Sequence, residues 1–376
     1  MTTSVRVVVD AAALLKGRLL SLGADDTVAL AADIDTEHGG IVVTGAKARA
    51  TVRQLRPVYP NLVLIEQPTV HEDRYATAEQ PFPVEREQDG QPSLFENDPV
   101  TVESVIEAQI ANGADVGVIP TGFLRAGDHA AMTAVSNGAN AIKRTDVILH
   151  LPLALTWVTV EADRAKLIAA IRRSKHPVVI SLAHKSDPAS QTGVVDGLLA
   201  LFEAVKNVGV WHSDLGTLEV LAYGGLCGAF GIRASHRHIV EPETRAFSPS
   251  KGHDKSPNVL MGALQRFKKS QAMTIDWFAN GGEPSCPCPV CGNRPLNRFT
   301  ASASDVLEAH RHNLHLVTDL HRGLLASPNR RAWWAELLAA AELAHMELSS
   351  ATNVKIEPDP ALRKRIALNP LTDFGH

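Results

Sequence analysis

The amino-acid sequence predicts an α/β protein folded as a (β/α)8 TIM-like barrel. The chain has 376 residues, which is enough for one large domain with a sizeable core. Short apolar runs recur along it, and they are almost continuously hydrophobic, as strands buried on both faces are. Amphipathic segments separate these runs, and repeated strand–helix alternation is typical of parallel α/β folds. A doubly wound sheet is the alternative, although no G-x-G-x-x-G motif follows a strand.

The predicted strands are seven apolar runs, separated by segments such as "TVESVIEAQIANG" and "DRAKLIAAIRRS" that have the pattern of helices. An eighth strand is expected in the N-terminal stretch "SVRVVVDA", which would complete the barrel. The seven runs are residues 27–35, 61–68, 114–122, 145–153, 176–184, 208–214 and 228–235.

The net charge and the hydropathy of the chain bear on whether it binds nucleic acid or a membrane. The formal net charge is −4, so the protein as a whole is not a basic surface for nucleic acid. Any contact with nucleic acid needs a local basic patch, such as "RFKKS" at 266–270. No run of about 20 apolar residues is present, so no membrane span is expected. The start of the chain lacks the pattern of a signal peptide, which favours a cytoplasmic protein.

Three of the four cysteines lie within the stretch "SCPCPVCGNRPLNRF". Cys286, Cys288 and Cys291 form a C-x-C-x-x-C pattern, and three clustered thiols are a poor disulfide framework but good metal ligands. A fourth ligand is expected from the following helix, where His312 and His315 are both candidates. Three thiolates and one imidazole close a tetrahedron around zinc, so we expect a structural Zn²⁺ with no open position for substrate.

The C-x-C-x-x-C pattern followed by "HNLH" resembles the zinc motif of the tRNA-guanine transglycosylases. That superfamily includes the archaeosine enzymes and the DNA 7-deazaguanine transglycosylases, and the resemblance covers roughly residues 27–325. It implies a (β/α)8 barrel with a zinc-binding insertion near the C-terminus, with His312 as the fourth ligand. It also implies base exchange on DNA or tRNA with a purine or 7-deazapurine base. A homodimer, or a partner subunit bound through the zinc region, is expected on the same ground.

The family's catalytic carboxylates are only partly matched. In the family an aspartate attacks the sugar C1′ and a second acid transfers protons, which is covalent catalysis by a carboxylate. By resemblance the nucleophile position falls on Gly231, in "LGTLEVLAYGGLCGAFGIRASHR", and glycine has no side chain. The position that reads the base falls on Thr121, in "GADVGVIPTG". The stretch "TEHGGIV" resembles the motif of the acid–base aspartate and assigns that role to Glu37.

Other carboxylates could have taken over the chemistry. Asp214 ends the run at 208–214, where residues of a barrel active site lie. Asp33 and Asp35 end the run at 27–35 and are expected to face the same mouth. The structural alternative for Asp214 is that it caps the helix that follows it.

Basic residues gather in "RASHRHIVEPETR", after the last predicted strand. Arg233, His236 and Arg237, with His238, are expected to bind phosphate or another part of the substrate, since arginine suits bidentate contacts with oxyanions. The structural alternative is an ordinary solvated loop with acidic partners.

These features predict three regions. Residues 1–262 are expected to form the barrel, with an exposed, acidic and proline-rich loop at 69–100. Residues 263–325 are expected to form the zinc-binding subdomain, and 326–376 a C-terminal helix followed by a polar tail.

Two functions of different classes fit these features. The first is a transglycosylase-like enzyme that handles guanine or 7-deazaguanine bases in nucleic acid, in genome modification or phage defence, with relocated carboxylates. The second is a catalytically degenerate subunit that keeps the barrel and zinc motif and serves as a scaffold or partner of another protein. A different small-molecule enzyme on the same barrel is a third option, because fold does not fix function.

Overall fold

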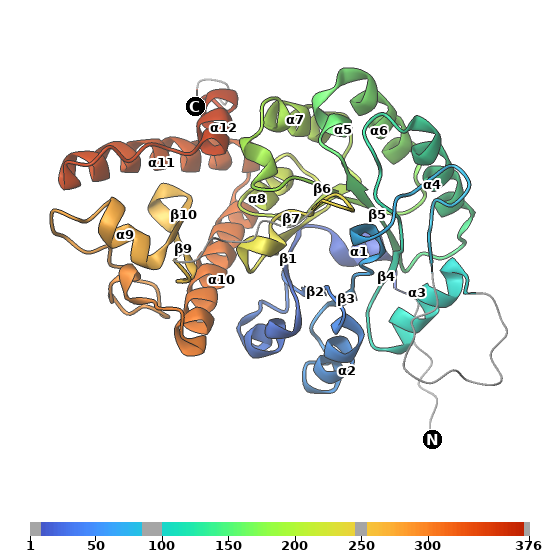
Figure 1. Cartoon of the computed structure of the whole chain (residues 1–376), viewed down its shortest axis with the longest axis horizontal. Coiled ribbons are helices and arrows are strands. Elements are labelled where there is room, and N and C mark those ends of the chain that lie inside the picture. Colours follow the sequence, from blue (N-terminus) through green and yellow to red (C-terminus); the bar gives the residue numbers. More distant parts are fainter. Residues whose placement is uncertain (1–8, 85–99, 245–253, 372–376) are drawn as a thin grey trace.

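A computed structural model describes residues 9–84, 100–244 and 254–371. Its centre is a sheet of eight parallel strands, ordered β3-β2-β1-β8-β7-β6-β5-β4 (Figure 1). The edge strands β3 and β4 meet through a bridge between Ile65 and Val116, and the Asp115 amide donates to the Leu64 carbonyl at 2.8 Å. The sheet is therefore a nearly closed barrel, and the predicted (β/α)8 fold is confirmed. The strands are β1 (Arg18–Gly23), β2 (Ile41–Val43), β3 (Leu64–Glu66), β4 (Gly117–Ile119), β5 (Val147–Leu153), β6 (Val178–Leu182), β7 (Val208–Ser213) and β8 (Cys227–Gly231).

Helices surround the barrel and connect successive strands (Figure 1). Side chains cap the starts of some of them: the Asp128 carboxylate accepts from the Ala131 amide at α4, and Thr101 and Ser104 form a reciprocal capping box at α3. The α-helices are α1 (Ala11–Leu15), α2 (Ala48–Val58), α3 (Val102–Ala111), α4 (His129–Ala141), α5 (Thr156–Thr159), α6 (Glu161–Arg173), α7 (Val194–Ala204) and α8 (Gly216–Ala222), and the 3₁₀ turns are η1 (Asp25–Asp33), η2 (Val70–Glu72), η3 (Pro188–Ser190) and η4 (Ala234–His236).

The first predicted strand is wrong. Residues 27–35 lie in η1 and the turn after it, while "RLLSLG" and "IVV" supply β1 and β2. Alanine is depleted in strands, and the acidic pair Asp25–Asp26 at the start of this segment suits a helical N-terminus. Of the N-terminal stretch 4–11, residues 4–8 lie outside the described residues, and α1 begins at Ala11.

A second small sheet and four α-helices, α9 to α12, follow the barrel and lie to its left in Figure 1. The hairpin of β9 and β10 is antiparallel and spans the expected boundary at 262. The expected C-terminal helix is α11, but the predicted polar tail contains a further helix, α12, whose Arg365 is buried. The elements are β9 (Asn258–Met261), η5 (Gly262–Leu264), β10 (Arg266–Lys269), α9 (Ser270–Asp276), η6 (Leu296–Arg298), α10 (Ala303–Ala326), α11 (Arg330–Thr352) and α12 (Pro360–Leu368).

The loop predicted to be exposed at 69–100 is only partly described, because 85–99 lie outside the described residues. Its first part is exposed at 72–74 and 78–80, but some of its other side chains turn toward the barrel. His71 in η2 is 1 % exposed, and the Tyr75 hydroxyl donates to the Pro242 carbonyl at 2.9 Å. The segment therefore packs across the barrel, where its imidazole and aromatic groups contribute to the interior. Among the described residues, no helix is long and apolar enough to cross a membrane.

The barrel interior changes from apolar to polar toward the carboxyl ends of the strands. Inward residues near its middle form one apolar cluster that includes Leu20, Ile65, Ile148 and Val179. Successive residues of a strand point to opposite faces, so His150, two residues after Ile148, also points inward. This polar upper layer lies where active sites of this fold are built.

Candidate metal centre and barrel mouth

The cysteine motif forms a compact pocket with α10. Cys286, Cys288 and Cys291 are 7 %, 6 % and 0 % exposed, and their Sγ atoms lie within 4.8 Å of one another and of a His312 ring nitrogen. The chain turns back at Gly292, whose φ of 56° is left-handed. The structure thus brings together all four residues expected to bind the metal.

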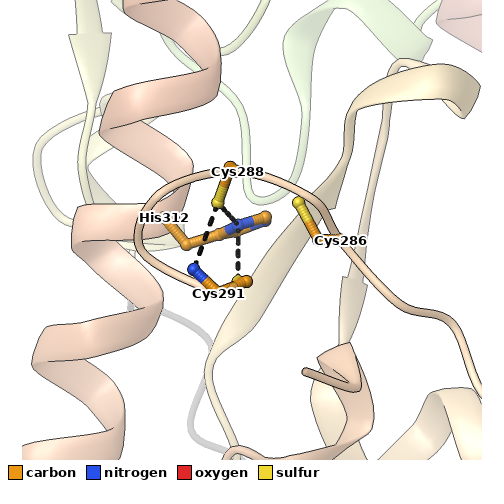
Figure 2. Close-up of side chains that lie close together, drawn as sticks. All are labelled: Cys286, Cys288, Cys291 and His312. Carbon is orange, nitrogen blue, oxygen red and sulfur yellow. Dashed lines mark hydrogen bonds between the residues drawn. The ribbon is translucent and has the colours of Figure 1, made fainter. Parts of the chain in front are cut away.

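Backbone groups orient the imidazole of His312. Its Nε2 bonds to the Leu260 carbonyl of β9 at 2.8 Å, and its Nδ1 lies 3.2 Å from Cys291 Sγ and 3.5 Å from Cys288 Sγ (Figure 2). The neighbouring Asn313 fixes the same strand, because its Oδ1 accepts from the Leu260 amide at 2.7 Å. A partner on one ring nitrogen directs the other toward a metal. His315, the other candidate, instead lies 3.0 Å from Asp319.

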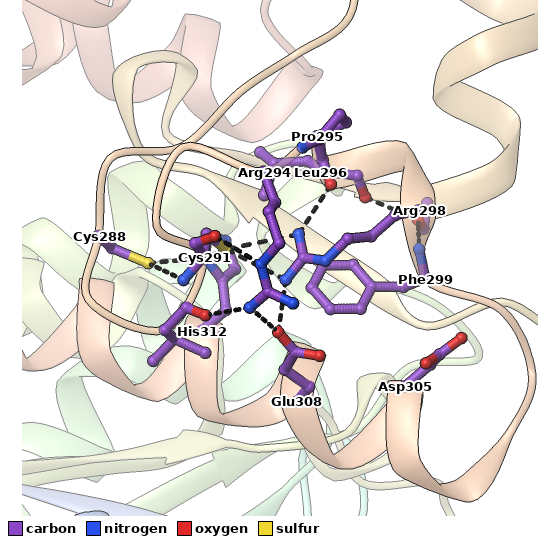
Figure 3. A network of polar contacts seen from close by, with 12 residues as sticks. Cys288, Cys291, Arg294, Pro295, Leu296, Arg298, Phe299, Asp305, Glu308 and His312 are labelled. Carbon is purple, nitrogen blue, oxygen red and sulfur yellow. Dashed lines mark hydrogen bonds and ion pairs between the residues drawn. The ribbon is translucent and has the colours of Figure 1, made fainter.

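An ion-pair network covers the outer side of the cluster (Figure 3). Arg298 reaches Cys291 Sγ at 3.6 Å and Glu308 of α10 at 2.7 Å. Arg294 also pairs with Glu308, at 2.5 Å, and its Nε donates to the Cys291 carbonyl. The network ties the cysteine loop to the helix that supplies the histidine.

The donor set fits a metal ion. Burial raises the pKa of Cys291 to about 12, and the nearby Arg298 only partly opposes this. Buried thiolates therefore need a strong cation, and soft sulfur with imidazole selects zinc or a similar transition metal. Four protein ligands leave no open position, so the centre can hold the subdomain together but not bind a substrate.

At the barrel mouth, Asp214 directly follows β7. Its Oδ1 accepts from the Gly216 amide at 3.0 Å, and its backbone carbonyl accepts from the Thr217 hydroxyl at 2.9 Å. The carboxylate thus organises the turn before α8, but it does not cap the helix as the structural alternative expected, because Leu215 is the N-cap residue and no side chain caps that end. A guanidinium nitrogen of Arg365 lies 3.8 Å from the same oxygen.

A second carboxylate, Asp187, follows the neighbouring strand β6. Burial raises its pKa to about 7, the negative charge of Asp214 adds to this, and Arg365 opposes it. Asp187 can therefore hold its proton near neutral pH. Asp187 was missed at the sequence level, because it comes five residues after its strand ends and looks like an ordinary loop aspartate in "HKSDPAS".

Arg237 brings a positive charge to this acidic pair. Burial lowers its pKa to about 10, while Asp214 and Asp187 act in the opposite direction. Its guanidinium stacks on the Phe267 ring at 3.6 Å from the centroid, and its Nε donates to the Gly231 carbonyl at 3.0 Å. Stacking and hydrogen bonding hold the side chain in one orientation.

Gly231 has no room for a side chain. A Cβ atom at this position would lie 2.3 Å from the His236 carbonyl oxygen and 2.7 Å from the Arg237 nitrogen. The position that the resemblance assigned to the nucleophile is therefore closed by the backbone of the following turn, and a carboxylate there requires that turn to move.

The other residues expected to bind substrate lie at the carboxyl ends of the strands but in different settings. Arg233 pairs with Asp26 at 2.8 Å. Burial lowers the pKa of His236, and its Nδ1 has no hydrogen-bond partner among the described residues. Thr121, after β4, is 2 % exposed and lies 3.4 Å from the Ile119 carbonyl through its hydroxyl. Among the described residues, no hydrogen bond joins Thr121 to Arg233 or Arg237.

Asp35 and Glu37 do not lie where expected. They precede β2, and the amide of Leu19, near the start of β1, donates to the neighbouring His38 carbonyl at 3.0 Å. They therefore belong to the amino-terminal end of the barrel, opposite Asp214. Asp35 pairs with Arg322 at 3.1 Å. The misplacement follows from the wrong first strand: because 27–35 is not a strand, its last residues do not reach the mouth. Asp33 likewise pairs with Arg311 of α10, at 2.9 Å.

Comparisons of the chain with protein-family models, with curated proteins and with solved structures give no significant match. Its function is therefore argued from the barrel mouth and the cysteine–histidine centre.

Proposed function

We propose that this protein is a transglycosylase-like enzyme that exchanges a guanine or 7-deazaguanine base in DNA or tRNA at the mouth of its barrel. The observation that carries this proposal is that Asp187 and Asp214 follow adjacent strands and interact with each other electrostatically. The positive charges of Arg365 and Arg237 act on both carboxyl groups. Glycosyl transfer through a covalent intermediate needs two carboxyl groups in different protonation states. The nature of the base rests on the resemblance of the metal motif.

The chemistry divides between the two acids. Asp214 attacks the sugar C1′, and a C–O bond forms as the C1′–N bond to the base breaks. The departing base takes up the electron pair of that bond and a proton from Asp187. The incoming base then gives its proton to Asp187 and attacks C1′, and its new C–N bond releases the Asp214 carboxylate. Asp35 and Glu37 have no role in this scheme because they lie at the other end of the barrel.

The cysteine–histidine centre is assigned to a structural Zn²⁺. Its role is to connect the loop at 286–291 with α10, which also contacts the barrel through Arg311 and Asp33 at 2.9 Å. Beside it, β10 carries Lys268, Lys269 and Arg266, a local basic strand suited to a nucleic-acid backbone. A protein with a net negative charge needs a local basic patch of this kind to bind a nucleic acid.

The second candidate is a degenerate subunit that acts as scaffold or partner of another protein. The closed position at Gly231 favours it, because the resemblance places the nucleophile there. Helix α11 also exposes Leu343 and Met346, at 59 % and 63 %, which suits contact with a second copy or a partner through the C-terminal region.

The test is base exchange by the purified, metal-loaded protein. Labelled guanine and 7-cyano-7-deazaguanine would be incubated with tRNA and with duplex DNA in separate reactions. Incorporation is expected to fall by roughly 10²–10⁴-fold in Asp214→Asn and in Asp187→Asn. The matched control is Asp196→Asn, an exposed carboxylate of α7 that pairs with Lys364 at 2.9 Å. If the wild-type protein labels neither substrate, the subunit proposal replaces the enzyme.

A further inference from the structure

Three histidines meet inside the barrel, below the mouth. His71 follows β3, His150 lies in β5, and His212 lies in β7; they are 1 %, 2 % and 7 % exposed. Their ring centroids are separated by 5.1 Å (71–150), 6.4 Å (71–212) and 6.5 Å (150–212). Alternate strands of a barrel contribute to one layer of its interior, and this layer would ordinarily be filled by apolar branched side chains.

The cluster contains polar atoms that lack partners. Neither ring nitrogen of His71 has a hydrogen bond within the described part of the chain, and neither does Nδ1 of His212. Backbone groups of Pro68 and His236 lie close to the rings of His71 and His212 and act to raise the pKa of these imidazoles, against the larger effect of burial. Buried polar atoms are rarely left unpaired, because each costs about 1–3 kcal/mol. Three such atoms in one layer indicate a missing ligand.

Neighbouring side chains already orient two of the rings. His150 Nε2 lies 2.9 Å from the Ser181 hydroxyl, and His212 Nε2 lies 3.0 Å from Gln67 Oε1. The second nitrogen of His212, Nδ1, has no hydrogen-bond partner among the described residues. This arrangement, with one nitrogen held by a polar neighbour, is the usual support of a metal-binding histidine.

The backbone of His212 is unusual in a way that serves the cluster. Its φ is 51°, and the pairing of β7 with β8 shifts register between Val210 and Ser213. Trp211 belongs to the barrel's inner cluster, so in a regular strand the next residue would point outward. The irregularity instead brings His212 beside His71 and His150. Strained backbone and bulges of this kind concentrate at functional sites.

We propose that His71, His150 and His212 bind a divalent transition-metal ion, in a second metal site separate from the cysteine–histidine centre. The chemistry that the three side chains share is metal coordination, because imidazole is a common ligand of divalent transition metals. Imidazole nitrogens bind zinc at about 2.0–2.1 Å, which places ring centres roughly 5 Å apart. The pair 71–150 already has this spacing, and His212 must approach by about 1 Å. Three protein ligands leave a position open for water or substrate.

Metal stoichiometry tests this proposal independently of any activity. The apo-protein would be titrated with Co²⁺ and followed by absorption and elemental analysis. About two equivalents are expected: one with intense thiolate-to-cobalt bands from the cysteine centre, and one with only weak visible bands from nitrogen ligands. The double variant His71→Gln with His150→Gln should keep the thiolate bands and bind about one equivalent.

The control is His176→Gln, a histidine that is 2 % exposed and bonded to the Ala139 carbonyl at 3.0 Å. It should leave the stoichiometry unchanged. A wild-type protein that binds a single equivalent, with thiolate bands, overturns the proposal whether or not the variants fold. A second equivalent that persists in the double variant overturns it too.

Discussion

Arg365 of the last helix, α12, contacts Glu219 of barrel helix α8, with Nε 3.3 Å from Oε2. Both side chains are buried, at 6 % and 1 % exposed. Burial raises the pKa of Glu219, and the guanidinium opposes this. Arg365 also lies 3.8 Å from Asp214, so the C-terminal segment supplies a charge to the barrel mouth. Shortening the chain before α12 would therefore alter the candidate active site as well as the surface.

Replacing Arg365 should reveal how much this contact matters to stability. Arg365→Met leaves the Glu219 carboxyl buried without its partner, and we expect a loss of about 3–5 kcal/mol in the free energy of unfolding. Urea unfolding followed by circular dichroism measures it. Arg363→Met is the control, because the Arg363 side chain is 56 % exposed and forms a solvent-accessible ion pair with Glu357 at 3.7 Å. If Arg365→Met lowers the free energy of unfolding no more than the control does, the buried Arg365–Glu219 pair does not contribute to stability.

The raised pKa of Asp187 predicts a specific pH dependence. Its carboxyl ordinarily has a pKa of 3.8 and in the folded protein about 7, so the folded state holds the proton more tightly than the unfolded state. Its contribution to stability is therefore fully present below pH 4 and is lost as the pH rises to about 7. We expect Asp187→Asn to stabilise the protein by on the order of 1–2 kcal/mol above pH 7 and by nothing near pH 4. Unfolding curves at both pH values decide this, and an equal effect at both would contradict it.

Loss of the proposed metal ion from the cysteine–histidine centre should loosen the C-terminal region. Cys291→Ser replaces a fully buried candidate ligand, and we expect the variant to bind no zinc at this centre and its melting temperature to fall by at least several degrees. His315→Ala is the control, because its ring pairs with Asp319 at 3.0 Å and lies outside the cluster. Elemental analysis and calorimetry measure both quantities. Zinc retained by Cys291→Ser, or lost from His315→Ala, would refute the ligand assignment.

The metal ligands were predictable because they depend on local spacing. The C-x-C-x-x-C pattern brings three thiols together by itself, and only the choice between His312 and His315 needed the resemblance. The barrel was predictable because buried parallel strands have a recognisable composition. The first strand was not, since "RLLSLG" is short and begins with Arg18, whereas "TVALAADID" has more apolar residues. An error in one strand moved Asp35 and Glu37 to the wrong end of the barrel.

The mouth itself depends on contacts between distant segments. Asp187 matters only because Asp214 lies close to it, and Arg365 reaches both from α12. His71 looked like part of an exposed acidic loop, and nothing local indicates that it turns into the barrel. Hydrophobic periodicity carries no information about contacts between residues that are distant in the sequence. The signal that could have found the histidine cluster is the placement of His150 and His212 within strands, where charged or polar residues are rarely buried without a reason.

Placing a carboxylate at Gly231 tests the nucleophile position that the proposed likeness to the transglycosylases assigns. The Cβ of Gly231→Asp would lie 2.3 Å from the His236 carbonyl oxygen, which is backbone and cannot rotate away. We expect a loss of roughly 1–3 kcal/mol or more in the free energy of unfolding, and no gain in base exchange. Gly262→Ala is the control, because its nearest neighbour would be the flexible Leu316 side chain at 3.5 Å. If Gly231→Asp is as stable as the control and gains exchange activity, the turn at 234–237 can open, and this chain is a degenerate relative whose original nucleophile can be restored.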